Sequence, residues 1–219
     1  MRYPSCEFCI EILEPENSYF YKLFSKYGFQ SRIIKDDQGF IAIAGLGALT
    51  EGYILLLPKE HYISLSYLPL QELVLLEKFK SKIEQLINKE YPNLIAFEHG
   101  AASNKRLGAA CLDHAHLHIC QCPVDLSHQI DNRFPVKTRV KNLLKLSEFR
   151  GQPYLYYENQ NGEKYIYCIP DQIESQYMRR LWAKSLNMAD MWDWGTFIGE
   201  DDIINTLKRL NTQEKLLRR

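Results

Sequence analysis

The chain has 219 residues, of which 46% are hydrophobic and 25% charged, and its 27 basic side chains balance its 27 acidic ones. These values are typical of a globular protein, and the balanced charge excludes a generally basic surface for holding nucleic acid. No apolar run is long enough to cross a membrane, and the first residues lack the apolar core of a signal peptide. We therefore expect a cytoplasmic protein that acts on small molecules, with reduced cysteines and with no membrane or specific nucleic-acid partner.

The first half of the chain predicts strands around one long helix. Apolar runs at residues 40–44 and 53–57 predict two strands, and glycines between them predict a turn. Residues 70–91 carry apolar side chains at helical spacing and predict a helix bounded by two prolines. A third strand is predicted at 94–98. A fourth is predicted at 114–120, where polar and apolar residues alternate.

The second half continues with a hairpin and helices. Tyrosine-rich segments at 154–158 and 164–169 flank Asn161-Gly162, which favours a hairpin turn. A helix is predicted over about 172–187, and a short amphipathic helix from Asp201. We predict an α+β protein with a compact domain over residues 1–125. Residues 126–219 are predicted to form an extension that packs on it.

The predicted strand at 114–120 contains His114, His116 and His118. Alternate residues of a strand point to the same face, so neighbouring imidazoles would lie about 6.6 Å apart. A plain core strand gains nothing from three imidazoles, because each needs a hydrogen-bond partner when buried. Two interpretations remain. The histidines either bind a metal ion, or one is a nucleophile while another stabilises developing negative charge.

The string His114-Ala-His116-Leu-His118-Ile-Cys120 resembles the signature of the histidine-triad (HIT) superfamily of nucleotide hydrolases and transferases, in which three histidines alternate with apolar residues. The segment 53–61, which ends in Pro-Lys-Glu-His, is similar to a strand of that family. The resemblance covers roughly residues 6 to 123. It implies a HIT-like fold, an antiparallel sheet with one main helix, to which the hairpin and helix of the C-terminal part are added.

The resemblance also implies a mechanism. His116 would attack the α-phosphorus of a nucleoside phosphate and form a nucleotidyl-histidine, which water or another acceptor then cleaves. His118 would contact the phosphate oxygens. Members of the superfamily are commonly homodimers, and we expect the same here.

Cys6 and Cys9 form a C-x-x-C pair, whose bite suits two thiolates on one zinc ion. Two ligands do not complete a site, so partners are needed. The resemblance implies His61 and His114 as these partners, in a structural zinc site with four protein ligands, and His99 is the alternative to His61. Zinc at His114 would leave His116 and His118 free for chemistry.

The segment before the histidines is expected to contact the nucleotide. Ser103 and Asn104 lie near the position that the family gives to an asparagine, and His99 precedes them. Cys111 lies five residues before His116, where many members carry a serine. A thiol is a weaker hydrogen-bond donor than a hydroxyl, so this departure weakens the expectation that the leaving group is assisted here.

Arginines and tryptophans are concentrated in the C-terminal third, at Arg179-Arg180-Leu-Trp182 and around Trp192 and Trp194. One interpretation is an arm over the nucleotide pocket, with Arg179 or Arg180 on a phosphate. The other is that the tryptophans belong to the core and the arginines form a solvated surface. The sequence alone favours the second.

Three functions are compatible with these features. The first is a nucleotide hydrolase that acts on nucleoside di- or polyphosphates, or on phosphoramidates, through His116. The second is a nucleotidyl transferase or phosphorylase that uses the same intermediate. The third is a nucleotide-binding or zinc-stabilised regulator without significant turnover.

Overall fold

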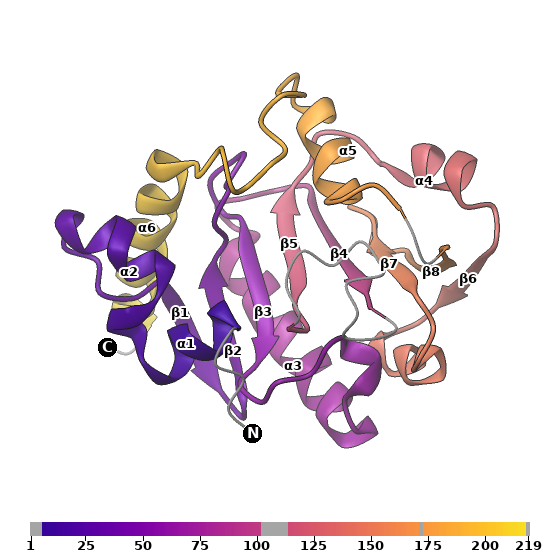
Figure 1. The fold of residues 1–219 in the computed structure, drawn as a ribbon, viewed down its shortest axis with the longest axis horizontal. Coiled ribbons are helices and arrows are strands. Elements are labelled where there is room, and N and C mark those ends of the chain that lie inside the picture. Colours follow the sequence, from indigo (N-terminus) through magenta and orange to yellow (C-terminus); the bar gives the residue numbers. More distant parts are fainter. Residues whose placement is uncertain (1–5, 102–113, 171–172, 218–219) are drawn as a thin grey trace.

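One antiparallel sheet runs through the computed structural model, which describes residues 6–101, 114–170 and 173–217 (Figure 1). Its strand order is β1-β2-β3-β5-β4-β7-β8-β6. The strands are β1 (Ile33–Asp37), β2 (Phe40–Ala44), β3 (Ile54–Pro58), β4 (Leu94–Gly100), β5 (Leu117–Gln121), β6 (Lys137–Val140), β7 (Tyr154–Glu158) and β8 (Lys164–Cys168). The predicted α+β class, with an antiparallel sheet and one main helix, is confirmed.

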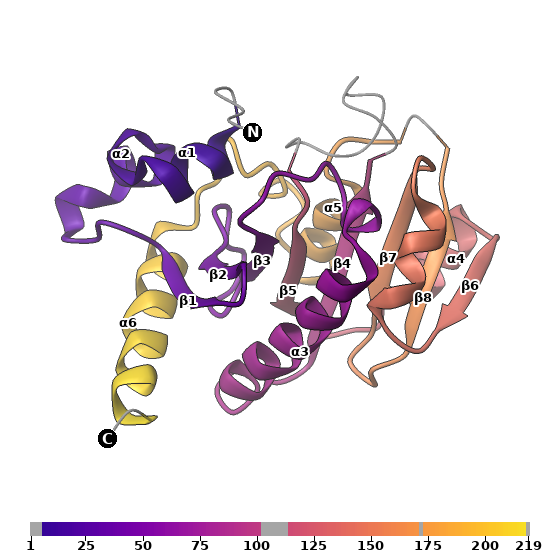
Figure 2. The same cartoon turned by 90° about the horizontal axis from the view of Figure 1, so that it is seen from below.

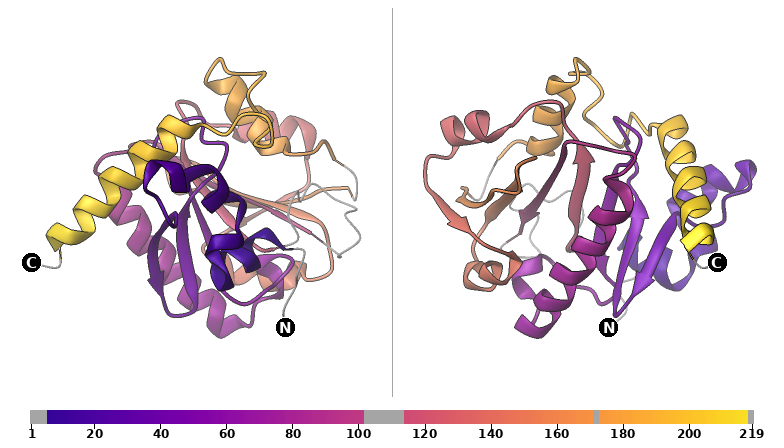
Figure 3. Two further views of the ribbon diagram at one scale, coloured as in Figure 1. Left: turned by 60° about the vertical axis from the view of Figure 1, so that its left-hand side comes forward. Right: turned by 180° about the vertical axis from the view of Figure 1, so that it is seen from behind.

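The helices lie around this sheet, and Figure 2 shows α3 along one of its faces. They are α1 (Glu7–Leu13), α2 (Tyr19–Phe24), α3 (Leu70–Ile87), α4 (Ser127–Arg133), α5 (Tyr177–Ser185) and α6 (Glu200–Leu217). Helix α6 packs against β1 and β2, and Figure 3 shows it along the outer side of the molecule. No helix in the described ranges is long and apolar enough to span a membrane.

The centre of the sheet is where the sequence is most apolar. Every residue of β2 and β3 is buried, so these strands are covered on both faces and show no alternation. Strand β5 lies between β3 and β4, and His118 stands opposite Leu55 on one side and Phe97 on the other. The histidine segment therefore enters the sheet between two largely buried inner strands.

The helices differ from the prediction at three places. Helix α3 ends at Ile87, four residues earlier than predicted, and a turn continues to Pro92. Helix α5 begins only at Tyr177, because Gln176 has a left-handed backbone with φ of 55°. The C-terminal helix α6 extends over 18 residues and is not short.

The fourth difference concerns the histidine strand. Strand β5 begins at Leu117, so His114 and His116 precede it. The backbone N–H of Ala115 donates to the carbonyl of Tyr62, at 2.6 Å, instead of joining the ladder with β3. The three imidazoles consequently do not share one face of a regular strand.

The sheet does not stop at residue 125. Strand β7 pairs with β4 over Ala96–Gly100, and β8 and β6 continue the same sheet outward. The predicted hairpin of β7 and β8 is present, and its turn contains Gly162 with φ of 75°. The division into residues 1–125 and 126–219 stays a prediction about domains.

Candidate active site and metal centre

Helix α1 brings two cysteines against the beginning of the histidine segment. Sγ of Cys6 lies 3.5 Å from Nδ1 of His114, and Sγ of Cys9 lies 3.6 Å from the same atom and 3.3 Å from Nδ1 of His61. One ligand atom of each of the four residues lies within 4.8 Å of the others. This cluster can bind a metal ion such as zinc.

The spacing of the cluster fits a tetrahedral zinc ion. Bond lengths of about 2.3 Å to sulfur and about 2.0 Å to nitrogen place sulfur and nitrogen ligands roughly 3.5 Å apart. The measured separations of Cys6 and Cys9 from the imidazoles lie close to this value. Nε2 of His114 lies 2.8 Å from the carbonyl oxygen of Pro58, which leaves Nδ1 without a proton and directed at the cysteines.

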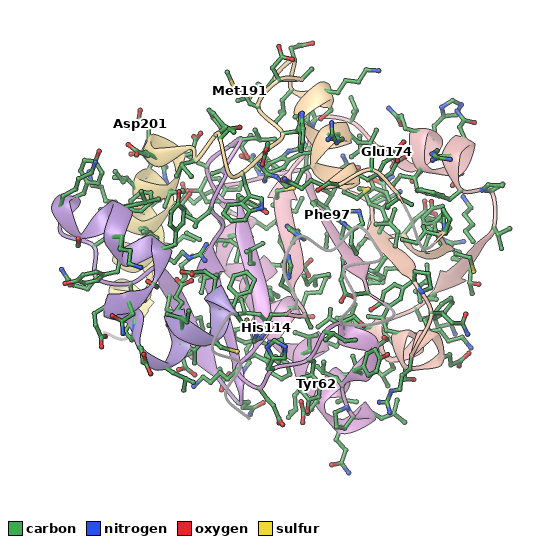
Figure 4. The ribbon with its side chains drawn as sticks, viewed as in Figure 1. Tyr62, Phe97, His114, Glu174, Met191 and Asp201 are labelled. Atoms are coloured by element: carbon green, nitrogen blue, oxygen red, sulfur yellow. The ribbon has the colours of Figure 1, made fainter. Side chains whose placement is uncertain are left out.

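His61 belongs to this cluster and His99 does not. His99 lies on β4 and lines a different cavity. In Figure 4, His114 lies on the side of Tyr62, and Phe97 lies farther toward α5. The alternative in which His99 replaces His61 is therefore wrong for this arrangement.

His116 is oriented by a backbone carbonyl. Its Nδ1 lies 2.6 Å from the carbonyl oxygen of His114, so Nδ1 carries the proton and Nε2 has the free lone pair. Burial lowers the pKa of His116, which keeps the ring neutral. The ring of Phe8 lies against it, with centroids 5.3 Å apart. A neutral imidazole with a fixed tautomer is the form that a nucleophilic histidine requires.

His118 is held by aromatic neighbours. Its ring stacks on Phe97 at a centroid distance of 4.4 Å, and its Nδ1 lies 2.7 Å from the hydroxyl of Tyr53. Burial raises the pKa of Tyr53 to about 12, so this hydroxyl stays protonated. We assign it as the donor to Nδ1, which places the ring proton of His118 on Nε2. Burial also holds the pKa of His118 well below its usual range.

A cavity adjoins these rings and opens to solvent. Its mixture of apolar walls and a few polar groups is typical of a small-ligand site. Its wall comes from α1, from β3, β4 and β5 with the segments beside them, from Arg32, and from the C-terminal third, and it includes apolar, aromatic and cationic groups. The lining residues are Glu7, Phe8, Arg32, Leu46, Tyr53, Leu55, Phe97, His99, His116, His118, Gln176, Arg179 and Trp194.

Several of these residues are not predicted from the sequence. Glu7 and Phe8 are the two residues between the cysteines of the C-x-x-C pair, and no local pattern marks them as pocket residues. Arg32 precedes an edge strand, and Tyr53 precedes an apolar one. A polar hydroxyl at the entrance of the run 53–57 was the one available signal for Tyr53. Ser103, Asn104 and Cys111 lie outside the described residues, so their predicted contacts stay predictions.

The C-terminal third contributes both core and pocket residues. Trp182 is fully buried, as the core interpretation predicted, and its Nε1 donates to the carbonyl of Gln121 at 2.7 Å. Arg179 is 3% exposed and lines the cavity together with Trp194. The interpretation of both arginines as a solvated surface is therefore wrong for Arg179. Arg180 lies over the ring of Trp192, at 3.3 Å from its centroid, and does not line the cavity.

Comparison with known proteins places this geometry in a family. Residues 18–132, more than half of the chain, match the family described as scavenger mRNA decapping enzyme C-term binding. CWF19-like protein 1 from Homo sapiens and from Pongo abelii are each 25% identical to it over 169 residues, 71% of the chain. The chain spans about a third of the length of these relatives, since the match covers 30% of each.

Solved structures with a similar fold include bacterial proteins. A HIT family protein from Bacillus anthracis is 19% identical, with a TM-score of 0.41, over 54% of this chain and 73% of its own. A HIT family hydrolase from Clostridium thermocellum is 21% identical, with a TM-score of 0.37, over 57% and 96%. A DUF4931 family protein from Bacillus cereus is 12% identical, with a TM-score of 0.45, over 73% and 99%.

His116 and His118 line one cavity, and more than half of the chain matches the family model. The chain therefore belongs to the scavenger mRNA decapping enzyme C-terminal family, within the HIT superfamily.

Proposed function

We propose that the protein is a nucleotide hydrolase that acts on nucleoside di- or polyphosphates through a nucleotidyl-His116 intermediate. The observation that carries the proposal is the hydrogen bond between Nδ1 of His116 and the carbonyl of His114, at 2.6 Å. It fixes the tautomer that leaves Nε2 of a cavity-lining, neutral ring available for attack. Membership of the HIT superfamily supports the same class of reaction.

The proposed reaction consists of two displacements at phosphorus. Nε2 of His116 forms a bond to the α-phosphorus while the bond to the leaving oxygen breaks, and the leaving group departs with the electron pair. Water then attacks the same phosphorus, the phosphorus–nitrogen bond breaks, and the water proton passes to solvent. The products are the nucleoside monophosphate, the leaving group and free His116.

His118 supports both steps. Because the hydroxyl of Tyr53 occupies Nδ1, the proton on Nε2 is available to a phosphate oxygen beside His116, whose ring centroid is 4.7 Å away. A fixed donor aimed at an oxygen where negative charge develops lowers the barrier to attack. The apolar wall, which includes Phe8, Leu46 and Leu55, is suited to a nucleobase.

Zinc in the cluster of Cys6, Cys9, His61 and His114 would be structural. Four protein ligands complete a tetrahedral shell, and no position is left for a substrate or an activated water. The ion would fasten α1 to the residues that precede β5. No step of the reaction involves it.

The test compares the parent protein with His116→Asn on a panel of nucleoside di- and polyphosphates, with and without inorganic phosphate. We expect the parent to release nucleoside monophosphate, and the variant to lose on the order of 10⁴-fold in rate. Equal rates for both proteins would overturn the assignment of His116. A nucleoside diphosphate that is formed from a polyphosphate substrate only when inorganic phosphate is present would identify a phosphorylase instead.

Nucleotide binding without turnover by the parent would identify a regulator. The homodimer, the cytoplasmic location and the contacts of Ser103, Asn104 and Cys111 stay predictions. The contact of His99 with the ligand is also a proposal, supported by its place in the wall of the cavity.

A further inference from the structure

Two buried arginines line the cavity, and their partners differ. Arg32 forms a two-pronged ion pair with Glu11, in which Nε and Nη2 lie 2.7 and 2.6 Å from the two carboxylate oxygens. Its charge is therefore neutralised inside the protein. Arg179 forms no ion pair with a carboxylate in the part of the chain that the structure describes.

Arg179 is nevertheless held firmly. Its Nε lies 2.8 Å from the carbonyl of Trp192 and 3.1 Å from Oε1 of Gln176, and its Nη2 lies 2.8 Å from the carbonyl of Gly47. The guanidinium also lies over the rings of Tyr53 and Trp182, at 5.7 and 5.8 Å. These contacts fix its orientation and leave one nitrogen, Nη1, for another partner.

Nη1 of Arg179 is buried and, among the described residues, has no hydrogen-bond partner. Nε2 of His99, which lines the same cavity, is also buried and has no hydrogen-bond partner among the described residues. A buried donor without a partner is costly, and a buried cation without a counter-charge is more so. Such groups are expected where a ligand supplies the missing acceptor. For a cationic fork the best acceptor is a phosphate or carboxylate oxygen.

The nearby carboxylate of Asp193 does not fill this role. Its Oδ1 accepts hydrogen bonds from Nε2 of Gln176 and from the backbone N–H of Gly195, both at 3.0 Å. These bonds lower the pKa of Asp193, and the charge of Arg179 contributes less. Asp193 thereby secures the loop that carries Trp192 against Gln176, and it leaves Nη1 of Arg179 without an acceptor.

The position of Arg179 indicates which anion it meets. It lies over the ring of Tyr53, whose hydroxyl bonds His118, and His118 in turn contacts His116. Arg179 is thus separated from the nucleophile by two side chains. An anion at Nη1 is therefore the group beyond the phosphorus that His116 attacks, and not that phosphorus itself.

We propose that Nη1 of Arg179 binds the phosphate next to the attacked α-phosphate, and that it makes the protein selective for phosphoric anhydrides over phosphoramidates with neutral leaving groups. This inference rests on the proposed function and names its substrate class. The fork of Arg179 is oriented by three acceptors, which a lysine cannot match.

The experiment measures kcat/KM for a nucleoside diphosphate and for the 5′-phosphoramidate of the same nucleoside, with the base chosen from the panel above. We expect Arg179→Gln and Arg179→Lys each to lower the ratio of the two values by roughly 10- to 100-fold. The ratio is unaffected by a loss of folded protein, because both substrates report on the same active fraction. Arg180→Gln, the neighbouring control outside the cavity, should leave the ratio unchanged.

Binding to the His116→Asn background gives a second reading without turnover. Adding Arg179→Gln should weaken binding of the nucleoside diphosphate and leave binding of the monophosphate unchanged. If kcat/KM falls equally for both substrates and binding weakens equally for both nucleotides, Arg179 does not bind the second phosphate and the inference is wrong. If the parent binds and cleaves no nucleotide at all, the proposed function itself fails.

Discussion

The cysteine–histidine cluster and the cavity beside His116 share one short segment of chain but differ in how completely their polar atoms are partnered. In the cluster, His114 directs one nitrogen at two cysteines and the other at a backbone carbonyl, so both nitrogens have partners. In the cavity, His99 and Arg179 each keep a buried nitrogen without one in the described residues. A single ion can therefore complete the first site, whereas in the second the two buried nitrogens are available to a larger ligand.

The largest expected effect would come from breaking the cluster. We expect Cys9→Ser to remove the bound metal and to lower the free energy of unfolding by several kcal/mol, because metal binding and folding are coupled. Elemental analysis and thermal unfolding measure the two effects. The exposed Cys168→Ser serves as the matched control and should keep the metal.

The metal content of His116→Asn is compared with that of Cys9→Ser. That variant should retain the metal content of the parent while losing turnover. Zinc that survived Cys9→Ser but left with His116→Asn would reverse the assignment of the two sites, and the histidines of the cavity would then be the metal ligands.

A smaller effect is expected at Glu98, which lies on β4 but does not line the cavity. Its carboxylate accepts hydrogen bonds from the N–H of Leu65, at 2.7 Å, and from the hydroxyl of Tyr154, at 2.6 Å. Burial nevertheless raises its pKa to about 8. The folded state therefore holds this proton at pH values where the unfolded chain has released it.

The sign of the pH dependence follows. Stability from Glu98 is complete below pH 4.5, its ordinary pKa, and is lost as the pH rises toward 8. The slope is at most about 1.4 kcal/mol per pH unit, for one proton. Urea unfolding at several pH values should show a flatter dependence for Glu98→Gln than for the parent. The exposed Glu148→Gln is the control, and identical slopes in all three proteins would contradict the raised pKa.

The smallest effect is expected within the cavity, at the hydroxyl that holds His118. Tyr53→Phe removes one hydrogen bond and keeps the ring, so we expect kcat to fall about tenfold with little change in melting temperature. Tyr27→Phe, at an exposed tyrosine, is the control. An unchanged kcat would show that the orientation of His118 does not depend on Tyr53.

The sequence predicts the parts of this molecule that depend on local patterns. The apolar runs of β2 and β3 and the C-x-x-C and histidine spacings are all visible within a few residues. Helix α1 is missed because seven residues are too few to show helical periodicity. Strand β6 is missed because it is an exposed edge strand, with almost no buried residue to produce alternation.

The cavity is harder to predict, because its contacts join distant parts of the chain. Arg179 meets Gly47 across 132 positions, and Tyr53 meets His118 across 65. No local pattern distinguishes Arg179 from Arg180, although one is buried in the cavity and the other is not. Helix α5 begins directly after the left-handed turn at Gln176, and the side chain of Gln176 also accepts a hydrogen bond from Nε of Arg179.

The C-x-x-C pair connects the possible metal site to the cavity. The two residues between its cysteines, Glu7 and Phe8, are part of the cavity wall, and Phe8 touches both His114 and His116. An ion held by Cys6 and Cys9 would therefore shape the wall on which the substrate rests.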